Sequence, residues 1–445
     1  MATPVIHAIA LSFLIADAPA TLRPTEKAGE STRIVIELKG EGLFKAAAED
    51  GAAEKGGASK ARSLKVETRL EFTEKILTVG KDGGATKAIR RVERAGAAIN
   101  GEVRATSATI RPEVATLVAE LRDGQVVVVS PGGPLTRAEL EVVQGPGDPL
   151  ALAALLPAAG VAKGESWTVG NDAARSLSGY DTLDDNGLKA TLESVDDARA
   201  VVRLKGQVRG SYLGGPGTIT LGGSFAFDRK AGRVESLEID RAEVRRPGPV
   251  EAGLDIKSTL KVSRRAVATP SELSEANLAG VPTEVDAARE LLVFVSPDGK
   301  YQLVHDRDWH IDWDGEKQAV LKRLDKGRFV AQCNLSAGPN AGAGRHEDPA
   351  RLRDDIKAAV GPRFVALVGE GVVDGAPAGG YRYKVAVQGR EGKAGVLWYY
   401  YLIAGPRGDQ VLAIFTLGLD QRERFGDQDL RLIGSFEWLG PAAKP

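Results

Sequence analysis

The feature that most constrains this chain is a long run of alternating apolar and polar residues between Leu188 and Val267. The alternation begins at LKATL and continues through GTITLGGSFAFD, GRVESLEIDRAEV and GLDIKSTLKVSRRAV. Period-two alternation is typical of strands with one buried face. Turn-forming residues separate the strands, at 196–197, 229–232 and 247–249. The run therefore predicts a twisted antiparallel meander with one polar and one apolar face.

The residues before this meander add further strands and two short helices. Strand patterns occur at 33–38, 63–72, around Ile110, and at 115–122 and 125–130. Thr136 can cap one helix, and Asp148-Pro149 can start another that buries Leu150, Leu152 and Leu155. The tract 46–61 is rich in small and charged residues, which favours a flexible loop. We expect a β-rich first domain over residues 21–268 and a linker over 269–283.

A second domain is predicted over residues 284–440. Residues 290–313, ELLVFVSPDGKYQLVHDRDWHIDW, indicate a hairpin with its turn at 296–299, followed by a Trp-bearing strand. Asp348 and Pro349 begin a helix that Gly361 ends, and 427–433 favours another. Strands are expected at 319–324, 328–335, 364–368, 381–387, 396–404, 411–417 and in the closing SFEWL. The fold class is thus α+β, dominated by β-structure.

The N-terminus resembles an export signal. Residues 5–15, VIHAIALSFLI, form an apolar run of signal-peptide length, and Ala18-Pro19-Ala20 offers small residues for cleavage after Ala20. The run lacks a preceding positive charge, and the alternative is a buried N-terminal strand or helix. We expect a signal peptide over residues 1–20, which would remove His7, and an exported protein. No segment is long and apolar enough for a transmembrane helix.

Charge and cysteine content exclude several classes of function. The 59 basic and 60 acidic residues nearly cancel, so there is no electrostatic case for binding nucleic acid. Cys333 is the only cysteine, which excludes intramolecular disulfides and cysteine-based zinc sites. It shares a face with apolar neighbours in FVAQCNL, and this favours a buried, inert thiol.

The second domain resembles the PsbP-like superfamily, which includes DcrB-type periplasmic proteins. The likeness lies in SPDGKYQLVHDRDWHI, YRYKVAVQG, VLWYYYLIAG, VLAIFTLGL and LRLIGSFEW. Where that family usually carries Pro-Gly-Trp or a similar triplet, this sequence has His305-Asp306-Arg307-Asp308 before its Trp. The resemblance implies a central antiparallel sheet with helices on its faces and an accessory or binding role without enzymatic activity.

The first domain resembles the exported half-barrel carriers of the LolA/LppX type. The likeness rests on the long meander, the embedded pair of helices and the GSFAFDRKAGRVESLEID hairpin. It implies a curved sheet whose concave apolar face holds acyl chains or a protein segment. No residue-level motif accompanies the likeness, so it assigns no binding residues.

One acidic stretch is a candidate metal site. If the strand after His305 continues, one of its faces carries Asp306, Asp308, His310, Asp312 and Asp314. Carboxylates and an imidazole could hold Ca²⁺ or Zn²⁺. The alternative is a solvated outer face opposite a core with Trp309 and Trp313, because side chains two apart on a strand project in parallel, ~7 Å apart. We favour the solvated face and assign no metal ligand.

An aromatic run and a glycine-rich run each resemble a ligand-binding site but also fit ordinary structure. Trp398-Tyr399-Tyr400-Tyr401 could line a pocket, but on a strand these rings divide between two faces and fit core packing. Gly214-Gly215-Pro216-Gly217 links strands and opens no helix, so it predicts a hairpin turn and not a phosphate loop. His346 precedes a helix cap and is expected to be exposed. The sequence contains no nucleophile elbow, phosphate-binding loop or His-Glu-x-x-His motif.

These observations lead to an exported, non-enzymatic binding or accessory protein of the cell envelope. The expected partner is a lipid or other apolar ligand, or an envelope protein; no cofactor is expected. The alternatives are a metal-dependent envelope hydrolase that uses the 306–314 strand, and a purely structural envelope component. Convergent polar side chains in a cleft would favour an enzyme, and an apolar cavity would favour a carrier.

Overall fold

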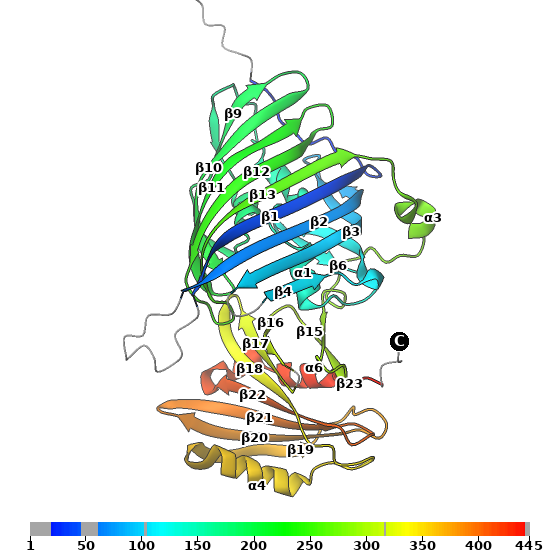
Figure 1. Ribbon diagram of the computed structural model, residues 1–445, viewed down its shortest axis with the longest axis vertical. Helices are drawn as coiled ribbons and strands as arrows, with labels where there is room; N and C mark the ends of the chain where they lie inside the picture. Colours follow the sequence, from blue (N-terminus) through cyan, green and yellow to red (C-terminus); the bar gives the residue numbers. More distant parts are fainter. Residues whose placement is uncertain (1–18, 46–60, 102–104, 316, 441–445) are drawn as a thin grey trace, which may run out of the picture.

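A computed structural model describes residues 19–45, 61–101, 105–315 and 317–440 of the chain (Figure 1). It is dominated by antiparallel strands and has two halves, the first containing strands β1 to β13 and the second β14 to β23. This confirms the β-dominated α+β class and the two-part layout. None of the helices within the described ranges is long and apolar enough to cross a bilayer.

The described residues of the first half form a 13-stranded sheet in the order β6-β5-β3-β2-β1-β13-β12-β11-β10-β9-β7, with β4 beside β3 and β8 beside β10. Its strands are β1 (Ser31–Lys45), β2 (Ala61–Val79), β3 (Ala85–Gly101), β4 (Ala105–Thr109), β5 (Thr116–Arg122), β6 (Gln125–Val129), β7 (Ser166–Thr168), β8 (Thr182–Asn186), β9 (Lys189–Val195), β10 (Arg199–Tyr212), β11 (Gly215–Asp228), β12 (Arg233–Arg245) and β13 (Gly253–Ala266). The meander predicted from Leu188 onward is therefore confirmed. Strand β3, which the sequence analysis did not predict, pairs with β2 along its length.

Short helices pack on the apolar face of this sheet. They are α1 (Arg137–Val143), η3 (Pro149–Leu155) and α2 (Asn171–Ser178), together with the turn η2 (Pro112–Val114). Thr136 caps α1 in a capping box with Glu139, and Asp148 caps η3 through the N–H of Leu150. Both caps were predicted, whereas α2 was not.

The same helices correct one expectation drawn from the half-barrel carriers. Leu150, Leu152 and Leu155 of η3 and Leu177 of α2 are buried in one cluster with inward-facing strand residues such as Ile239. The curved sheet is present, but its apolar face is filled by this chain's own helices (Figure 1).

The sheet bends sharply where glycines let neighbouring backbones approach. A Cβ on Gly42 would lie 2.1 Å from the Asp255 carbonyl oxygen, and one on Gly223 would lie 2.1 Å from the Glu238 carbonyl oxygen. Strands β10 and β11 are joined by Leu213 and Gly214, both with positive φ (48° and 78°). A hairpin turn is present as predicted, but Leu213 and Gly214 form it, and residues 215–217 of the predicted turn belong to β11.

The start of the described chain belongs to the first half. Residues 1–18 of the predicted signal peptide, and residues 46–60 of the predicted loop, lie outside the described residues. Ala20 donates to the Val161 carbonyl at 2.8 Å, accepts from the Val161 N–H at 3.0 Å, and is buried together with Leu22. Cleavage directly after Ala20 would therefore remove a residue of the core.

The segment between the halves packs against the sheet. It contains η4 (Ser271–Leu273) and α3 (Glu275–Leu278), at the predicted helical turn. Leu273 and Val285 form a small cluster with Ile89, Val118 and Val129 on the face of the sheet opposite the helices. The segment thus covers apolar side chains that β3, β5 and β6 would otherwise expose.

The second half combines a seven-stranded and a three-stranded sheet within the described residues. The larger has the order β16-β17-β18-β22-β21-β20-β19, from β16 (Trp309–Asp314), β17 (Gln318–Asp325), β18 (Arg328–Ala337), β19 (Phe364–Val372), β20 (Tyr381–Glu391), β21 (Ala394–Ala404) and β22 (Gln410–Gly418). The smaller has β14 (Leu292–Val295), β15 (Tyr301–His305) and β23 (Glu437–Trp438). The helical segments are α4 (Pro349–Val360), η5 (Gly361–Arg363), η6 (Leu419–Gln421), α5 (Arg422–Phe425) and α6 (Gln428–Gly434).

The two faces of the larger sheet divide the aromatic run as predicted. Trp398 and Tyr400 pack beneath α4, whereas Tyr401 packs on the other face with Phe415 and helix α6. The Tyr401 hydroxyl donates to buried Asp429 at 2.5 Å. The aromatic run is therefore core, and Cys333 is buried beside it as expected.

Several contacts join the halves. Leu292 forms a parallel bridge with Leu135 and is buried in the core of the first half. The Arg307 guanidinium donates to the Val128 carbonyl at 2.6 Å, and Lys322 donates to the Pro249 carbonyl at 3.0 Å. The β16–β17 hairpin is thus held against the end of the first sheet (Figure 1).

Candidate ligand site between the two halves

The predicted Asp/His strand face does not form. The N–H of Asp308 donates to the Asp306 carboxylate at 3.1 Å, which makes a turn, and β16 begins only at Trp309. A register shift between Ile311 and Trp313 then interrupts the alternation. The prediction of one continuous face from Asp306 to Asp314 was wrong, because aspartate stabilises turns through its own backbone.

The carboxylates of this stretch pair with cations of the next strand. Asp306 accepts from Arg323 at 2.8 Å, Asp308 accepts from the same guanidinium at 3.2 Å, and Asp312 lies 3.0 Å from Lys322. Within the described residues, no group of three or more His, Cys, Asp or Glu side chains could hold a metal ion. Trp309 is buried, as predicted.

A polar cavity of about 720 Å³ lies where β16 and β17 meet the first half. The first half lines it with residues of α1, α2, β12 and the β10–β11 turn, and the second half with Arg307, Asp308, His310 and Leu324. Its volume falls within the range of small-molecule sites, roughly 300–1,000 Å³. This cavity, and not the 306–314 strand alone, brings convergent polar side chains together.

Strand β12 supplies three buried charged residues to the cavity wall. Its inward positions are apolar at Leu237 and Ile239, and then become Arg241, Glu243 and Arg245, all buried and all lining the cavity. A charge buried without a partner is costly, so such a change on a core face needs an explanation. The alternation in GRVESLEIDRAEVRR contains this change from apolar to charged inward positions, but these three residues were not among the predicted site residues.

Arg241 has few partners for a buried cation. Within the part of the chain that the structure describes, it donates one hydrogen bond, from Nη2 to the Ser178 carbonyl at 2.8 Å, and its Nε has no partner. Among the described residues no carboxylate forms an ion pair with it. Burial lowers the pKa of Arg241. The guanidinium therefore has unused hydrogen-bonding capacity next to the cavity.

Arg245 and two tyrosines complete this wall. The Arg245 guanidinium lies over the Tyr212 ring, 4.7 Å from its centre, and its Nη1 is 3.5 Å from Glu243 Oε1. The Arg245 Nε, the Glu243 Oε1 and the Tyr180 hydroxyl have no hydrogen-bond partner among the residues that the structure describes. Burial raises the pKa of Tyr180 and of Tyr212, so both hydroxyls stay protonated near neutral pH.

The opposite wall combines structural and unused groups. The Arg307 guanidinium donates to the Glu290 and Val128 carbonyls and to the side chain of Gln144. Burial lowers the pKa of Arg307 to about 10. Arg137 donates to the Arg307 and Trp309 carbonyls, but its Nε has no partner. Burial lowers the pKa of His310 to about 3, so this imidazole is neutral near pH 7.

Three carboxyl groups lie at or near the cavity. Glu141 and Asp181 line it and reach solvent, yet the surrounding protein raises the pKa of each. Glu251, which is half-buried near the cavity, has its pKa raised by burial to about 7; Arg245 opposes this rise, and Glu141 adds a smaller one. Burial therefore favours the neutral form of each of these acids.

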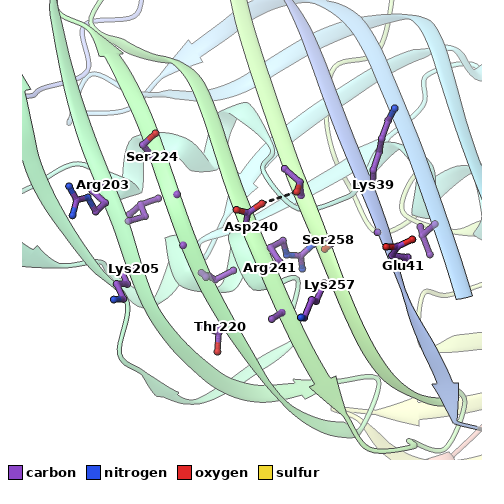
Figure 2. A pocket seen from close by; sticks show the side chains of 18 of the residues that line it. Lys39, Glu41, Arg203, Lys205, Thr220, Ser224, Asp240, Arg241, Lys257 and Ser258 are labelled. Carbon is purple, nitrogen blue, oxygen red and sulfur yellow. Dashed lines mark hydrogen bonds between the residues drawn. The ribbon is translucent and has the colours of Figure 1, made fainter. Parts of the chain in front are cut away.

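A second hollow, of about 1080 Å³, lies on the opposite face of the sheet over β10 to β13 and β1. Figure 2 shows Lys39, Lys205 and Lys257 on three different strands, without a common point toward which they converge. The Asp240 carboxylate accepts from the Thr259 hydroxyl at 2.8 Å, and Arg203 pairs with Glu193. This face is a solvated sheet surface hollowed by small residues such as Gly222 and Ala242.

Comparison with known proteins gives no functional assignment. No protein-family model matches the sequence, and no curated protein matches it. Among solved structures, a protein of Bacteroides thetaiotaomicron VPI-5482 aligns at 14% identity over 34% of this chain and 50% of its own, with a TM-score of 0.26. This chain thus spans half the length of that structure. Cyanobacterial PsbP (CyanoP) of Synechocystis sp. PCC 6803 aligns at 11% identity over 39% of this chain and 99% of its own, with a TM-score of 0.27. TM-scores this low carry no argument about function.

Proposed function

We propose that this protein is an exported, non-enzymatic binding protein of the cell envelope that holds a small ligand in the cavity between its halves. In this proposal the second half is a PsbP-like α+β domain that closes one side of the site. The observation that carries the proposal is Arg241, a buried cation on the cavity wall with one neutral hydrogen-bond partner. A buried charge without compensation is costly to fold, and a ligand that compensates it is a physical reason to keep it.

Two features support binding over catalysis by the Asp/His stretch. The carboxylates of Asp306, Asp308 and Asp312 are engaged by Arg323 and Lys322. The imidazole of His310 lines the cavity, while Asp306 and Asp312 are absent from its wall. The metal-dependent hydrolase therefore remains the second candidate: the polar side chains of the cavity wall favour it, but within the described residues no group of three or more His, Cys, Asp or Glu side chains could hold its metal.

The apolar ligand expected from the sequence needs a different location in this proposal. The apolar face of the sheet is occupied by η3 and α2. The interdomain cavity does have apolar wall residues, among them Leu38, Val126 and Leu140. A ligand with both an apolar and a polar part fits that composition better than a purely apolar one.

Native mass spectrometry of the full chain, expressed with its leader, tests the proposal with two matched variants. Gly145 lines the cavity, Gly222 lines the outer hollow, and a Cβ added at either meets no atom within 4 Å. We expect a retained small molecule in the unmodified protein and in Gly222→Trp, and its loss in Gly145→Trp. Equal retention in both variants would place the ligand elsewhere, and no retained molecule in any sample would refute the proposal.

A further inference from the structure

We infer that the cavity between the halves selects an organic monocarboxylate with an apolar body. This inference rests on the proposed binding function and narrows the chemical class of its ligand. It concerns the Arg241, Glu243 and Arg245 row of β12, its hydroxyl neighbour Tyr180, and the apolar residues across the cavity.

The charge of the β12 row calls for one negative charge. Glu243 lies 3.5 Å from Arg245 and can offset one of the two guanidiniums. Arg241 remains, buried to 8% exposure, with no ion pair among the described residues and its Nε unpartnered. Two arginines and one glutamate leave a single positive charge on this wall. An oxyanion of one charge would restore neutrality and accept the unused N–H groups.

The unused donors match a carboxylate. Among the described residues, the Nε groups of Arg241 and Arg245 and the hydroxyl of Tyr180, which is 2% exposed, lack hydrogen-bond partners; the carboxylate of Glu243, whose Oε1 also lacks one, lies next to that hydroxyl. Guanidinium groups bind carboxylates in a planar, often bidentate geometry, and a neutral phenol adds a third donor. Because burial keeps Tyr180 protonated near pH 7, its hydroxyl can donate to an anion.

The cavity favours one charge over two and requires an apolar body. Because Arg241 is the one guanidinium of this row without an ion pair among the described residues, a dianion such as a phosphate monoester would keep one uncompensated charge. Leu38, Val126, Leu140 and Leu213 form apolar wall that a simple inorganic ion would leave uncovered. The volume of about 720 Å³ exceeds the need of a bare ion.

Three unbranched probes with eight carbon atoms each test the inference on the full chain. Octanoate, octanol and octyl phosphate differ in the head group, and isothermal titration calorimetry measures the affinity of each. We expect octanoate to bind at least tenfold more tightly than either of the others. Equal affinity for octanol would overturn the inferred carboxylate contact, and tighter binding of octyl phosphate would overturn the preference for a single charge.

Variants of two arginines test the site. Arg241→Met should weaken octanoate at least tenfold and leave octanol unchanged. Arg203→Met, at an exposed arginine of the outer face, should leave both within twofold. If Arg241→Met does not fold, Arg241→Lys should still weaken octanoate at least threefold, because it replaces a planar fork by a single ammonium. Unchanged octanoate affinity in a folded Arg241 variant would overturn the inference.

The outcome also separates this inference from the proposed function. Failure of all three probes to bind would overturn the monocarboxylate inference. The binding function would then still be decided by retention in Gly222→Trp and loss in Gly145→Trp. Binding of octanol and octanoate with equal affinity, blocked by Gly145→Trp, would uphold the cavity as a site while rejecting its anion selectivity.

Discussion

Two arginines of the same sheet, Arg90 on β3 and Arg241 on β12, are both buried but have very different hydrogen-bond partners. Arg90 donates three hydrogen bonds to two carboxylates: Nε to Glu74 at 2.9 Å, and Nη1 and Nη2 to Asp148 at 2.7 Å each. Arg241 donates one, to the Ser178 carbonyl. Burial acts on both, but in Arg90 the two carboxylates outweigh it and raise the pKa, whereas in Arg241 burial prevails and lowers it.

The surroundings extend the contrast. Next to Arg90, Arg264 donates to buried Glu26 at 2.6 Å and lies 3.8 Å from Glu74, so cations and carboxylates alternate through the core. Asp148 also caps η3, which ties this network to the helix that fills the sheet. Atoms without a hydrogen-bond partner among the described residues occur in both places, Glu74 Oε1 and Arg264 Nε near Arg90, but around Arg241 they belong to residues that line a cavity. The comparison separates a charge network that completes a fold from one that is incomplete without a further molecule.

The largest expected effect is that of Arg90→Met. This change leaves Glu74 and Asp148 buried without their shared cation, and breaking a buried ion pair in this way costs about 3–5 kcal/mol. Urea denaturation measures the free energy of unfolding. Arg203→Met, which breaks an exposed pair with Glu193, is the matched control and should cost no more than ~1 kcal/mol. Equal losses in the two variants would contradict the structural role given to the Arg90 network.

Asp148→Asn should have a smaller effect. Asparagine caps helices about as well as aspartate, so the bond to the Leu150 N–H survives and only the charge that faces Arg90 is lost. We expect a loss of about 1–3 kcal/mol by urea denaturation, the range for a buried hydrogen-bonding group that loses its partner. Asp148→Ala removes the cap as well and should cost about 1 kcal/mol more. If the two variants were equally stable, the cap would contribute nothing.

The difference between these regions was only partly accessible from the sequence. The sequence predicts three helix starts from N-cap residues, and each of these residues caps a helix in the structure: Thr136, Asp148 and Asp348. Helix α2 lacks such a signal, since its N-cap is Gly170 and makes no side-chain hydrogen bond. Strand β3 has the composition of a helix, yet long-range pairing with β2 overrides local propensity.

The candidate site shows the same limit. Alternation along GRVESLEIDRAEVRR places Arg241, Glu243 and Arg245 on the apolar face. The presence of charged residues on a core face can therefore be predicted from the sequence alone. That Arg90 meets carboxylates 16 and 58 residues away, while Arg241 meets a cavity closed by β16 and β17, depends on tertiary contacts. Asp306 and Asp308 form a turn and not a strand, because the bond from the Asp308 N–H to the Asp306 carboxylate outweighs the alternation of the surrounding sequence.

Arg241→Met sharpens the contrast with Arg90→Met. Because Arg241 pairs with no carboxylate among the described residues, its removal strands no buried anion, and only one hydrogen bond to Ser178 is lost. We expect the free energy of unfolding to change by no more than about 1 kcal/mol. A loss of unfolding free energy as large as that of Arg90→Met would show that Arg241 stabilises the fold. The surroundings of Arg90 and of Arg241 would then both be structural charge networks.

The smallest expected effect is a pH dependence at Glu251, on the cavity side of the comparison. Burial raises its pKa from 4.5 to about 7 in the folded protein. The folded state therefore holds this proton more tightly than the unfolded chain does. The stability that it contributes is complete below pH 4.5 and is lost as the pH rises through 7. The effect is modest because the carboxyl is partly solvated.

Glu251→Gln isolates this contribution, because glutamine is neutral at every pH. Urea denaturation of both proteins should find the variant more stable than the unmodified chain at pH 8, and the two nearly equal at pH 5. His305 and His310, whose pKa values burial lowers to about 4 and about 3, destabilise both proteins equally in acid and cancel in the difference. A difference that stayed constant with pH would mean that Glu251 is not held in its neutral form. Glu251 would then ionise in the folded protein as readily as an exposed carboxyl group on the outer face of the sheet.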